Sequence, residues 1–452
     1  MPSQPRVLRS QRKIIGHFEV VNPRAAGVDA GSEKHLVSVP EECRDQPVRT
    51  FGTLTKDLEA LADWLVECGI TTVAIEATGV YWIPLYEILE QRGLDPRLVD
   101  AHSIGKRNKK TDVLDCQWIR QLHTYGLLDA AFRPPAQIRP VRALTRQRRM
   151  LIEHAAQHIQ HMQKALEMMN VKLHLVLSDV VGVTGLRIIR AIIAGKTTPA
   201  ELATLREPNC SASEQMFIDA LQGNYRAEHL FALRQALTLF EVHQTLIAEC
   251  DTRIESELRA LQRVEVKSNS PKQQKKRSRR KNEPHFEATA LLHQMAGVDL
   301  TAVDGLESST VLTILSEVGT DMSSWSSAKQ WAAWLNLAPN NRITGGKPIR
   351  AKGKVIRPNR AAQALRLAAQ TLERSKCALG AFFRRIQARH GRQAAIKATA
   401  HKLALIVYSM LKNQTEYRDP GVDYYERRYR DNLLKSLTKR AAELGFNLVP
   451  AT

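Results

Sequence analysis

The stretch AAGVDAGSEKHLVSV, residues 25–39, contains two short β-rich runs separated by a glycine turn. Three further runs of the same kind follow at residues 47–54 (PVRTFGTL), 71–78 (TTVAIEAT) and 95–101 (DPRLVDA), each bounded by Gly, Pro or Asp. Residues 55–69 and 79–93, which lie between these runs, carry apolar side chains at helical spacing. Three strands, a helix, a strand, a helix, a strand and a final helix predict an α/β domain over residues 24–135.

The composition is that of a globular protein of two or three domains. The chain has 452 residues, of which 43% are hydrophobic and 25% are charged. No apolar run reaches the roughly 18 to 20 residues of a membrane span, and residues 1–20 lack a signal-peptide core. The six cysteines are scattered without a CxxC pair. We therefore expect a cytoplasmic protein with reduced thiols and no membrane association.

The charge balance predicts a polyanionic partner. Lys and Arg total 66 against 46 Asp and Glu, a formal net charge of +20. A charge of this size favours binding to nucleic acid through the release of counterions.

The rest of the chain predicts an all-α part after the α/β domain. Two long helical stretches, at 138–176 and 227–264, predict a helical or coiled-coil arm over residues 136–267. Residues 268–284 contain the basic run PKQQKKRSRRK, which predicts a linker. Residues 285–415 predict a helical domain in which TAVDGLESSTVLTILSEVG, residues 301–319, is typical of a helix-hairpin-helix. Residues 416–452 form a charged helical tail.

Basic residues recur at helical spacing at the start of the arm. Arg139, Arg142, Arg146 and Arg149 lie three or four residues apart and form a stripe along one helical face. This stripe is consistent with contacts to a nucleic-acid backbone and also with an ordinary solvated face.

Four acidic residues of the α/β domain form the candidate metal site. Asp29 lies at the end of the first strand, and Glu76 lies at the end of the strand that follows the first helix. In KKTDVLDCQW, residues 109–118, Asp112 and Asp115 are three positions apart and share one face of a helix. The alternative interpretation of Asp112 and Asp115 is a solvent-exposed acidic face whose charge is neutralised by Lys109 and Lys110.

Carboxylates at neighbouring strand ends, together with a DxxD helix, form a cluster that is unstable without cations. With two Mg²⁺ ions bound about 4 Å apart, this cluster would form an active site that holds a phosphodiester for cleavage. Mn²⁺ is a second possible metal.

A second candidate site is the loop NRITGGK at residues 341–347. Thr344 supplies a hydroxyl, and Gly345 and Gly346 allow backbone N–H groups to approach a phosphate. The surrounding segment offers positive charge without any acid, and its basic residues are Arg342, Lys347, Arg350, Lys352 and Lys354.

Taken in order, the GVDAG strand (27–31), the IEATG strand (75–79) and the TDVLD helix (111–115) resemble DEDD insertion-sequence transposases, the bridge-RNA-guided recombinases of the IS110/IS1111 family. The segments AVDGLESSTVLTILSEVG and WLNLAPNNRITGGKPIRAKGK, residues 302–319 and 334–354, are similar to that family's second transposase domain. The resemblance implies an N-terminal RuvC-like ribonuclease-H fold, a coiled-coil arm and a helical C-terminal transposase domain.

The resemblance also implies roles for particular residues. Asp29, Glu76, Asp112 and Asp115 would hold Mg²⁺, and Thr344 would stand where the family has a nucleophilic serine. The partners implied are donor and target double-stranded DNA, a noncoding guide (bridge) RNA and further copies of the chain in a tetramer. The implied setting is the bacterial cytoplasm, in association with the nucleoid.

Threonine at position 344 leaves three interpretations open. It can act as the nucleophile, it can cripple the covalent step because its extra methyl crowds the attack, or it can only hydrogen-bond a phosphate. Two other functions remain open. One is a structure-specific nuclease that uses the four carboxylates with metal-activated water, and the other is a catalytically silent nucleic-acid-binding protein in which Thr344 serves recognition. Tyr424, Tyr425 and Tyr429 in YYERRY raise the idea of a tyrosine nucleophile, which lacks the basic sequence context it would need.

Overall fold

The computed structural model describes residues 19–77, 79–99, 112–261, 282–339, 343–344, 347–348 and 359–449, without the side chains of 112, 343–344 and 347–348. The chain divides into two compact units, one ending at Arg133 and the other beginning at Pro134. Each unit is described by itself. The five-part division of the chain stays a prediction.

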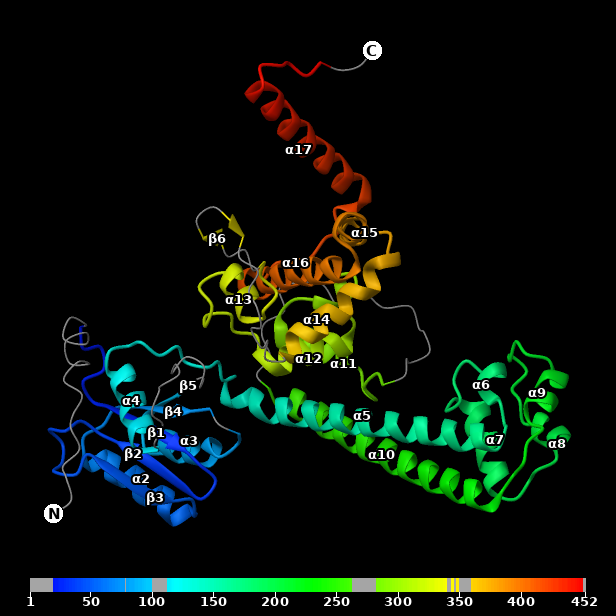
Figure 1. Cartoon of the computed structure of the whole chain (residues 1–452), viewed down its shortest axis with the longest axis horizontal. Helices are drawn as coiled ribbons and strands as arrows, with labels where there is room; N and C mark the ends of the chain where they lie inside the picture. Colours follow the sequence, from blue (N-terminus) through cyan, green and yellow to red (C-terminus); the bar gives the residue numbers. More distant parts are fainter. Residues whose placement is uncertain are drawn as a thin grey trace. The chain divides into compact units, whose positions relative to one another are not determined.

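The first unit is a mixed α/β structure built on one five-stranded sheet with strand order β3-β2-β1-β4-β5 (Figure 1). Strands β1, β2 and β3 form an antiparallel meander, whereas β4 and β5 run parallel to β1. The elements follow one another in the expected order: β1 Ala25–Ala30, β2 Lys34–Ser38, β3 Val48–Gly52, α2 Thr55–Glu67, β4 Thr72–Glu76, α3 Trp82–Gln91, β5 Asp95–Val99 and α4 Asp112–Thr124.

The two faces of this sheet have different coverings because side chains alternate along each strand. On one face, Ala26, Val28, Val73 and Ile75 join the core formed with α2 and α3. On the other face, Ala74 and Val99 pack with Ile119 of α4. Helix α4 thus covers the face of the sheet on which Gly27 of β1 and Ala74 of β4 lie, together with the residues two positions further along each strand.

Gly27 determines how closely α4 approaches β1. A Cβ atom at this position would lie 2.3 Å from the backbone nitrogen of Arg120 and 2.4 Å from the carbonyl oxygen of Cys116. Both distances are far below van der Waals contact, so only glycine allows the helix backbone to rest on the strand. Since Asp115 directly precedes Cys116 in α4, the same contact places the start of this helix on the sheet.

The second unit is helical. Its arm begins with η1 Ala136–Ile138, and α5 Arg139–Met168 then pairs with α10 Ala227–Ala260. The far end of the arm carries α6 Leu173–Val176, α7 Val183–Ile193, α8 Pro199–Ala203 and α9 Glu214–Ala220 (Figure 1). One continuous apolar core runs along the arm, from Leu151 and Leu237 to Ile189 and Phe217.

The remaining elements of the unit are α11 Ala288–Ala296, η2 Leu300–Ala302, α12 Ser308–Val318, α13 Ala328–Trp334, β6 Ile343–Thr344, β7 Lys347–Pro348, α14 Arg360–Thr371, η3 Leu372–Arg374, α15 Ala378–His390, α16 Arg392–Asn413 and α17 Gly421–Glu443. Helix α16 is central, since α13, α14 and α15 all pack against it. Trp325 and Trp331 are buried here, and Tyr408 of α16 donates a hydrogen bond to the carbonyl oxygen of Trp325 at 2.9 Å. Ahead of α12, the predicted helix-hairpin-helix contains only the 3₁₀ turn η2 and a left-handed Gly305.

One helix among the described residues, α16, is long and apolar enough to cross a membrane by length and composition. Its most apolar window has a mean hydropathy of 1.2, and 56% of that window is buried inside the protein. A central core helix is expected to pass the same test, and the contacts of α16 are those of such a helix.

The packing at Gly27 gives a stability prediction. Gly27→Ala forces α4 away from β1, and we expect a loss of about 1–3 kcal/mol, typical of overpacking, together with faster hydrogen exchange in α4. Gly93→Ala is the matched control, because a Cβ added at Gly93 would meet no atom within 4 Å and only the positive φ of 77° is strained. It should destabilise the chain without changing exchange in α4. Unchanged α4 exchange in Gly27→Ala would contradict the packing argument.

Candidate active site

Two of the predicted acidic residues lie side by side on the central strands. β1 and β4 are parallel and in register at Val28 and Ile75, so the next residue along each strand is Asp29 and Glu76 respectively. Residues opposite one another on adjacent strands project from the same face. This face is the one covered by α4, because Gly27 and Ala74 are two positions earlier on the same strands. Both acidic residues are partly buried.

The third described carboxylate comes from α4. The Cys116 thiol is buried, and burial, followed by the negative charge of Asp29, raises its pKa to about 12, to which Asp115 also contributes. Carboxylates from β1 and α4 therefore lie near the same thiol. Asp112 begins α4, three residues ahead of Asp115, and its side chain lies outside those described.

The described side chains do not by themselves form a metal site. No three His, Cys, Asp or Glu side chains among them lie close enough together to hold an ion, and Asp112 is not part of that set. The donor type is nevertheless suitable, since carboxylate oxygens are the ligands that hard divalent cations prefer. Asp29, Glu76 and Asp115 are thus brought to one face of the sheet but are not gathered around a common point.

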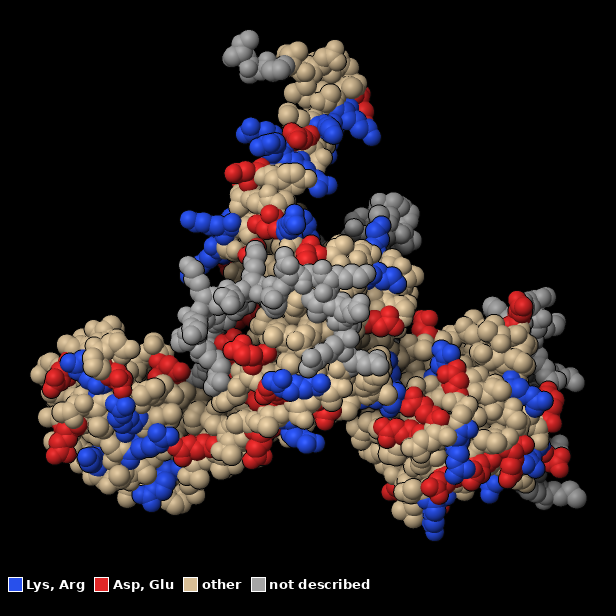
Figure 2. Space-filling view, turned by 180° about the vertical axis from the view of Figure 1, so that it is seen from behind, with Lys and Arg blue, Asp and Glu red and all other residues tan. Residues whose placement is uncertain are grey.

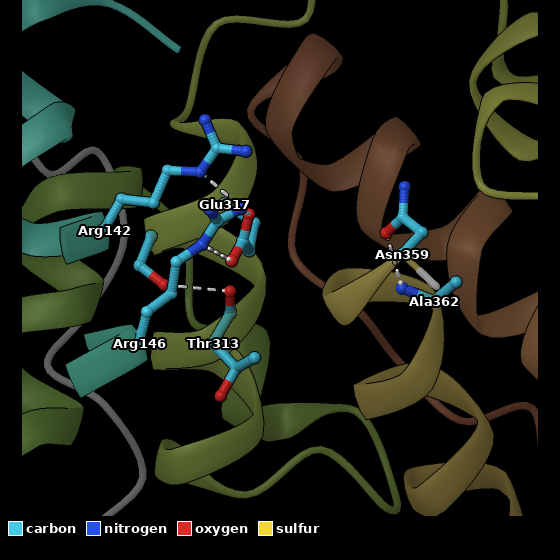
Figure 3. Close-up of polar contacts among 7 residues, drawn as sticks. Arg142, Arg146, Thr313, Glu317, Asn359 and Ala362 are labelled. Carbon is cyan, nitrogen blue, oxygen red and sulfur yellow. Dashed lines mark hydrogen bonds and ion pairs between the residues drawn. The ribbon is translucent and has the colours of Figure 1, made fainter. Parts of the chain in front are cut away.

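The second candidate site is described only in its backbone. Strands β6 and β7 pair antiparallel, with Thr344 opposite Lys347. Gly345 and Gly346 lie outside the described residues, as do Arg342, Arg350, Lys352 and Lys354. After this segment the chain enters α14, where the Asn359 side chain accepts a hydrogen bond from the Ala362 amide at 3.0 Å (Figure 3).

The arginine stripe of α5 has partners inside the protein (Figure 3). Arg142 donates to Glu317 of α12 at 2.9 Å, and Arg146 donates to both oxygens of the same carboxylate at 2.7 and 2.6 Å. The Glu317 side chain is only 7% exposed. Burial alone would raise the pKa of Glu317, but the hydrogen bonds and charges of Arg146 and Arg142 outweigh it and hold this pKa below its ordinary value.

The other two arginines of the stripe also have contacts within the chain. Arg149 bonds Glu153 at 2.9 Å and Gln363 at 3.0 Å, and Arg139 donates to the Pro134 carbonyl at 3.4 Å. Neither interpretation of the stripe from the sequence, as a nucleic-acid contact or as a solvated face, predicted this buried ion-pair cluster. Its only signal in the sequence is Glu317, a lone acid in an otherwise uncharged helix. Nucleic-acid binding by these four arginines stays a prediction.

Positive charge is distributed unevenly along the chain. The segments outside the described residues hold 22 of the 66 Lys and Arg but only 2 of the 46 Asp and Glu. The described part is therefore electrically balanced, and Figure 2 shows acidic and basic side chains interspersed over its surface. Lys109 and Lys110 lie outside the described residues, as does most of the predicted linker 268–284. The net charge of +20 resides in these basic segments.

Comparison with family models gives two matches. A model of IS110-type DEDD transposases, described as "Transposase", matches residues 26–171, and the model "Transposase IS116/IS110/IS902 family" matches residues 298–384. Together they span about half of the chain. The protein is a transposase. Both matches support membership of the IS110 family, and no curated protein matches the chain.

The matched regions coincide with the two candidate sites of the transposase. The first contains Asp29, Glu76, Asp112 and Asp115, and the second contains Thr344. A transposase is an enzyme of DNA recombination, so the chain binds DNA, and the DEDD type implies dependence on a divalent metal.

The Glu317 cluster gives a second stability prediction. In Glu317→Gln the two arginines lose their counter-charge, and we expect a loss of about 2–4 kcal/mol, below the cost in a fully buried pair because both guanidinium groups are partly exposed. Urea unfolding followed by circular dichroism measures this loss. Because the folded-state pKa is lowered, the contribution is complete above the ordinary value of 4.5 and should fade as the pH falls below it.

Glu153→Gln is the matched control for this change. Glu153 is 61% exposed and pairs with Arg149 on the same helix, so its loss should cost less than about 1 kcal/mol. Equal effects of the two substitutions would show that Glu317 is no more than a surface partner.

Proposed function

We propose that this transposase is an RNA-guided site-specific recombinase that excises and inserts a mobile element through a covalent protein–DNA intermediate. The observation that carries the proposal is the coincidence of the two transposase matches with the two candidate sites. One site is a set of carboxylates on a sheet face, and the other is a threonine that directly precedes two glycines in the sequence. A metal-dependent nuclease would need only the first of these sites.

The first unit is proposed to have a RuvC-like ribonuclease-H fold. Support comes from the strand order β3-β2-β1-β4-β5, with an antiparallel meander followed by two parallel strands, and from the DEDD transposase match over this region. In such a sheet, ligands are expected at the carboxyl ends of parallel strands, which is where Asp29 and Glu76 lie.

Asp29, Glu76, Asp112 and Asp115 are proposed to hold the divalent metal, Mg²⁺ or Mn²⁺. Carboxylates confined to one face of the sheet repel one another, and this repulsion favours a bound cation. When bound, the metal would neutralise the charge of the phosphate and stabilise the departing oxygen. The role of the carboxylates themselves would be to bind and position the metal on the face covered by α4.

The hydroxyl of Thr344 is proposed as the nucleophile. Its Oγ1 forms a bond to phosphorus as the bond from phosphorus to the DNA 3′ oxygen breaks, while the threonine proton leaves to solvent and the 3′ oxygen gains one. The product is a 5′-phosphothreonyl bond and a free 3′ hydroxyl. Attack by a 3′ hydroxyl on that bond rejoins the DNA and regenerates threonine, so no external energy source is needed.

Recognition of the DNA is proposed to come from base pairing with a guide RNA, and the active form is proposed to be a tetramer. The basic segments outside the balanced, described surface support a role in gripping nucleic-acid backbones without reading sequence. Among them, the run from Arg342 to Lys354 surrounds the proposed nucleophile.

The carboxylate site is tested with Asp29→Asn in the full-length protein, purified with the RNA it retains. With Mg²⁺ and a nicked suicide substrate made from DNA flanking the chain's own coding region, cleavage should fall more than about 100-fold while DNA binding persists. Asp95→Asn is the matched control, because its carboxylate pairs with Arg97 at the opposite end of the sheet. Normal cleavage by Asp29→Asn would remove Asp29 from the mechanism.

The nucleophile is tested on the same substrate by denaturing electrophoresis. We expect a covalent adduct with the unaltered chain, none with Thr344→Ala, and an adduct at least as abundant with Thr344→Ser, which removes the crowding methyl. Cleavage without an adduct in the unaltered chain would instead indicate a nuclease that uses water. Absence of both products would indicate a nucleic-acid-binding protein without chemistry.

A further inference from the structure

Helices α15, α16 and α17 enclose a cavity of about 520 Å³, within the range of sites that bind small molecules or a single nucleotide. Its floor is apolar and includes Leu379, Leu405 and Ile406. Its rim carries the tyrosines of the YYERRY segment together with Lys402 and Arg428. The cavity lies in the second unit and contains none of the residues assigned to the proposed recombination mechanism.

The tyrosines of α17 have two different settings. Tyr425 and Tyr429 are four residues apart on the face toward α15, where Tyr425 meets Phe382 edge-on at 6.2 Å. Arg385 lies over both rings, 5.0 Å from the centroid of Tyr425 and 3.6 Å from that of Tyr429. Tyr424 lines the cavity and is 51% exposed, so its ring is available to a ligand.

The cations around these rings have no ion pair with an acid of the described segments. Lys402 is half-buried, with its Nζ 3.8 Å from the centroid of Phe382 and 5.4 Å from that of Tyr425. Burial and the charge of Arg428 lower the pKa of Lys402, and no carboxylate opposes this effect. Within the described part of the chain, no ion pair joins an Asp or Glu to Lys402, Arg385, Arg389 or Arg428, whereas the arginines of α5 that face other helices each have one.

This combination of groups restricts the ligand. Lys402 and Arg385 are partly buried, whereas Arg389 and Arg428 are exposed, and partly buried positive charges without counter-charges are stabilised by an anion. A free phosphate would leave the apolar floor unfilled, and an acidic peptide would find no strand edge to pair with among the lining helices. A nucleotide can occupy both the charged and the apolar parts of the cavity, because its phosphate pairs with the cations and its base packs against the aromatic and apolar surfaces.

We propose that this cavity binds one unpaired nucleotide, with its base against Tyr424 and the apolar floor and its phosphate on Lys402 and Arg428. The base must be unpaired because a base within a duplex has both faces stacked and cannot reach a tyrosine ring. RNA and DNA both present this chemistry. The proposal rests on the protein being a nucleic-acid enzyme but not on the covalent role of Thr344.

The test measures binding alone, so it is independent of strand cleavage. Short labelled single strands of RNA and DNA and the corresponding DNA duplex are titrated into the full chain, and fluorescence anisotropy gives the affinity. Tyr424→Ala should weaken single-strand binding about tenfold or more, whereas Tyr424→Phe, which keeps the ring, should bind as the unaltered chain does. Because Tyr424 is exposed, neither change should lower the melting temperature.

Lys402→Gln tests the phosphate contact. It should weaken single-strand binding and reduce the slope of log affinity against log salt by about one, compared with Lys412→Gln, an exposed lysine at the end of the same helix. If only RNA binding is weakened, the cavity is specific for RNA. If binding of the RNA and DNA single strands is weakened equally, the cavity accepts a nucleotide of either kind. Both outcomes support the proposal. Equal sensitivity of the duplex, or no difference between the cavity variants and their controls, would overturn it.

Discussion

The close contact between the backbone of α4 and strand β1 at Gly27 is the constraint on which the candidate active site depends. It holds the DxxD helix against the sheet face that carries Asp29 and Glu76. A side chain at this position would push the helix away from the strand and move Asp115 with it. The carboxylates share one face of the sheet because one strand position has no Cβ, and the acidic residues themselves provide only repulsion.

The second unit is organised by buried ion pairs between distant segments. Glu317 joins α12 to α5, and Asp251 joins α10 to α5 through Arg148 at 2.5 Å, with both side chains of that pair buried. Asp251 also accepts a hydrogen bond from the His285 amide, and Arg148 donates to the Asn282 carbonyl. These bonds attach the residues that follow the basic segment to the base of the arm. The transposase match at 298–384 begins directly beyond this attachment.

Most of the first unit was predictable from the sequence, because alternation of apolar residues along the strands and their 3.6-residue spacing along the helices directly reflect burial. The order of the elements follows that pattern. Gly27 was expected in a strand but its packing role was not anticipated, although an isolated glycine in a strand is a sign of close backbone approach. The partners of Arg142 and Arg146 could not be predicted, since Glu317 lies more than 170 residues away.

Local chemistry in the chain specified the elements, the acidic positions and the basic segments, because each depends on neighbours within a few residues. Tertiary structure decided which charges are paired. It buried Glu317 against the arginine stripe and placed Asp29 and Asp115 near Cys116. Beside the three tyrosines, it left Lys402 and Arg428 without an ion pair to any described acid. Those outcomes depend on which helices pack together. Packing is a property of the whole fold, because it follows from summed burial over distant segments and not from any local pattern.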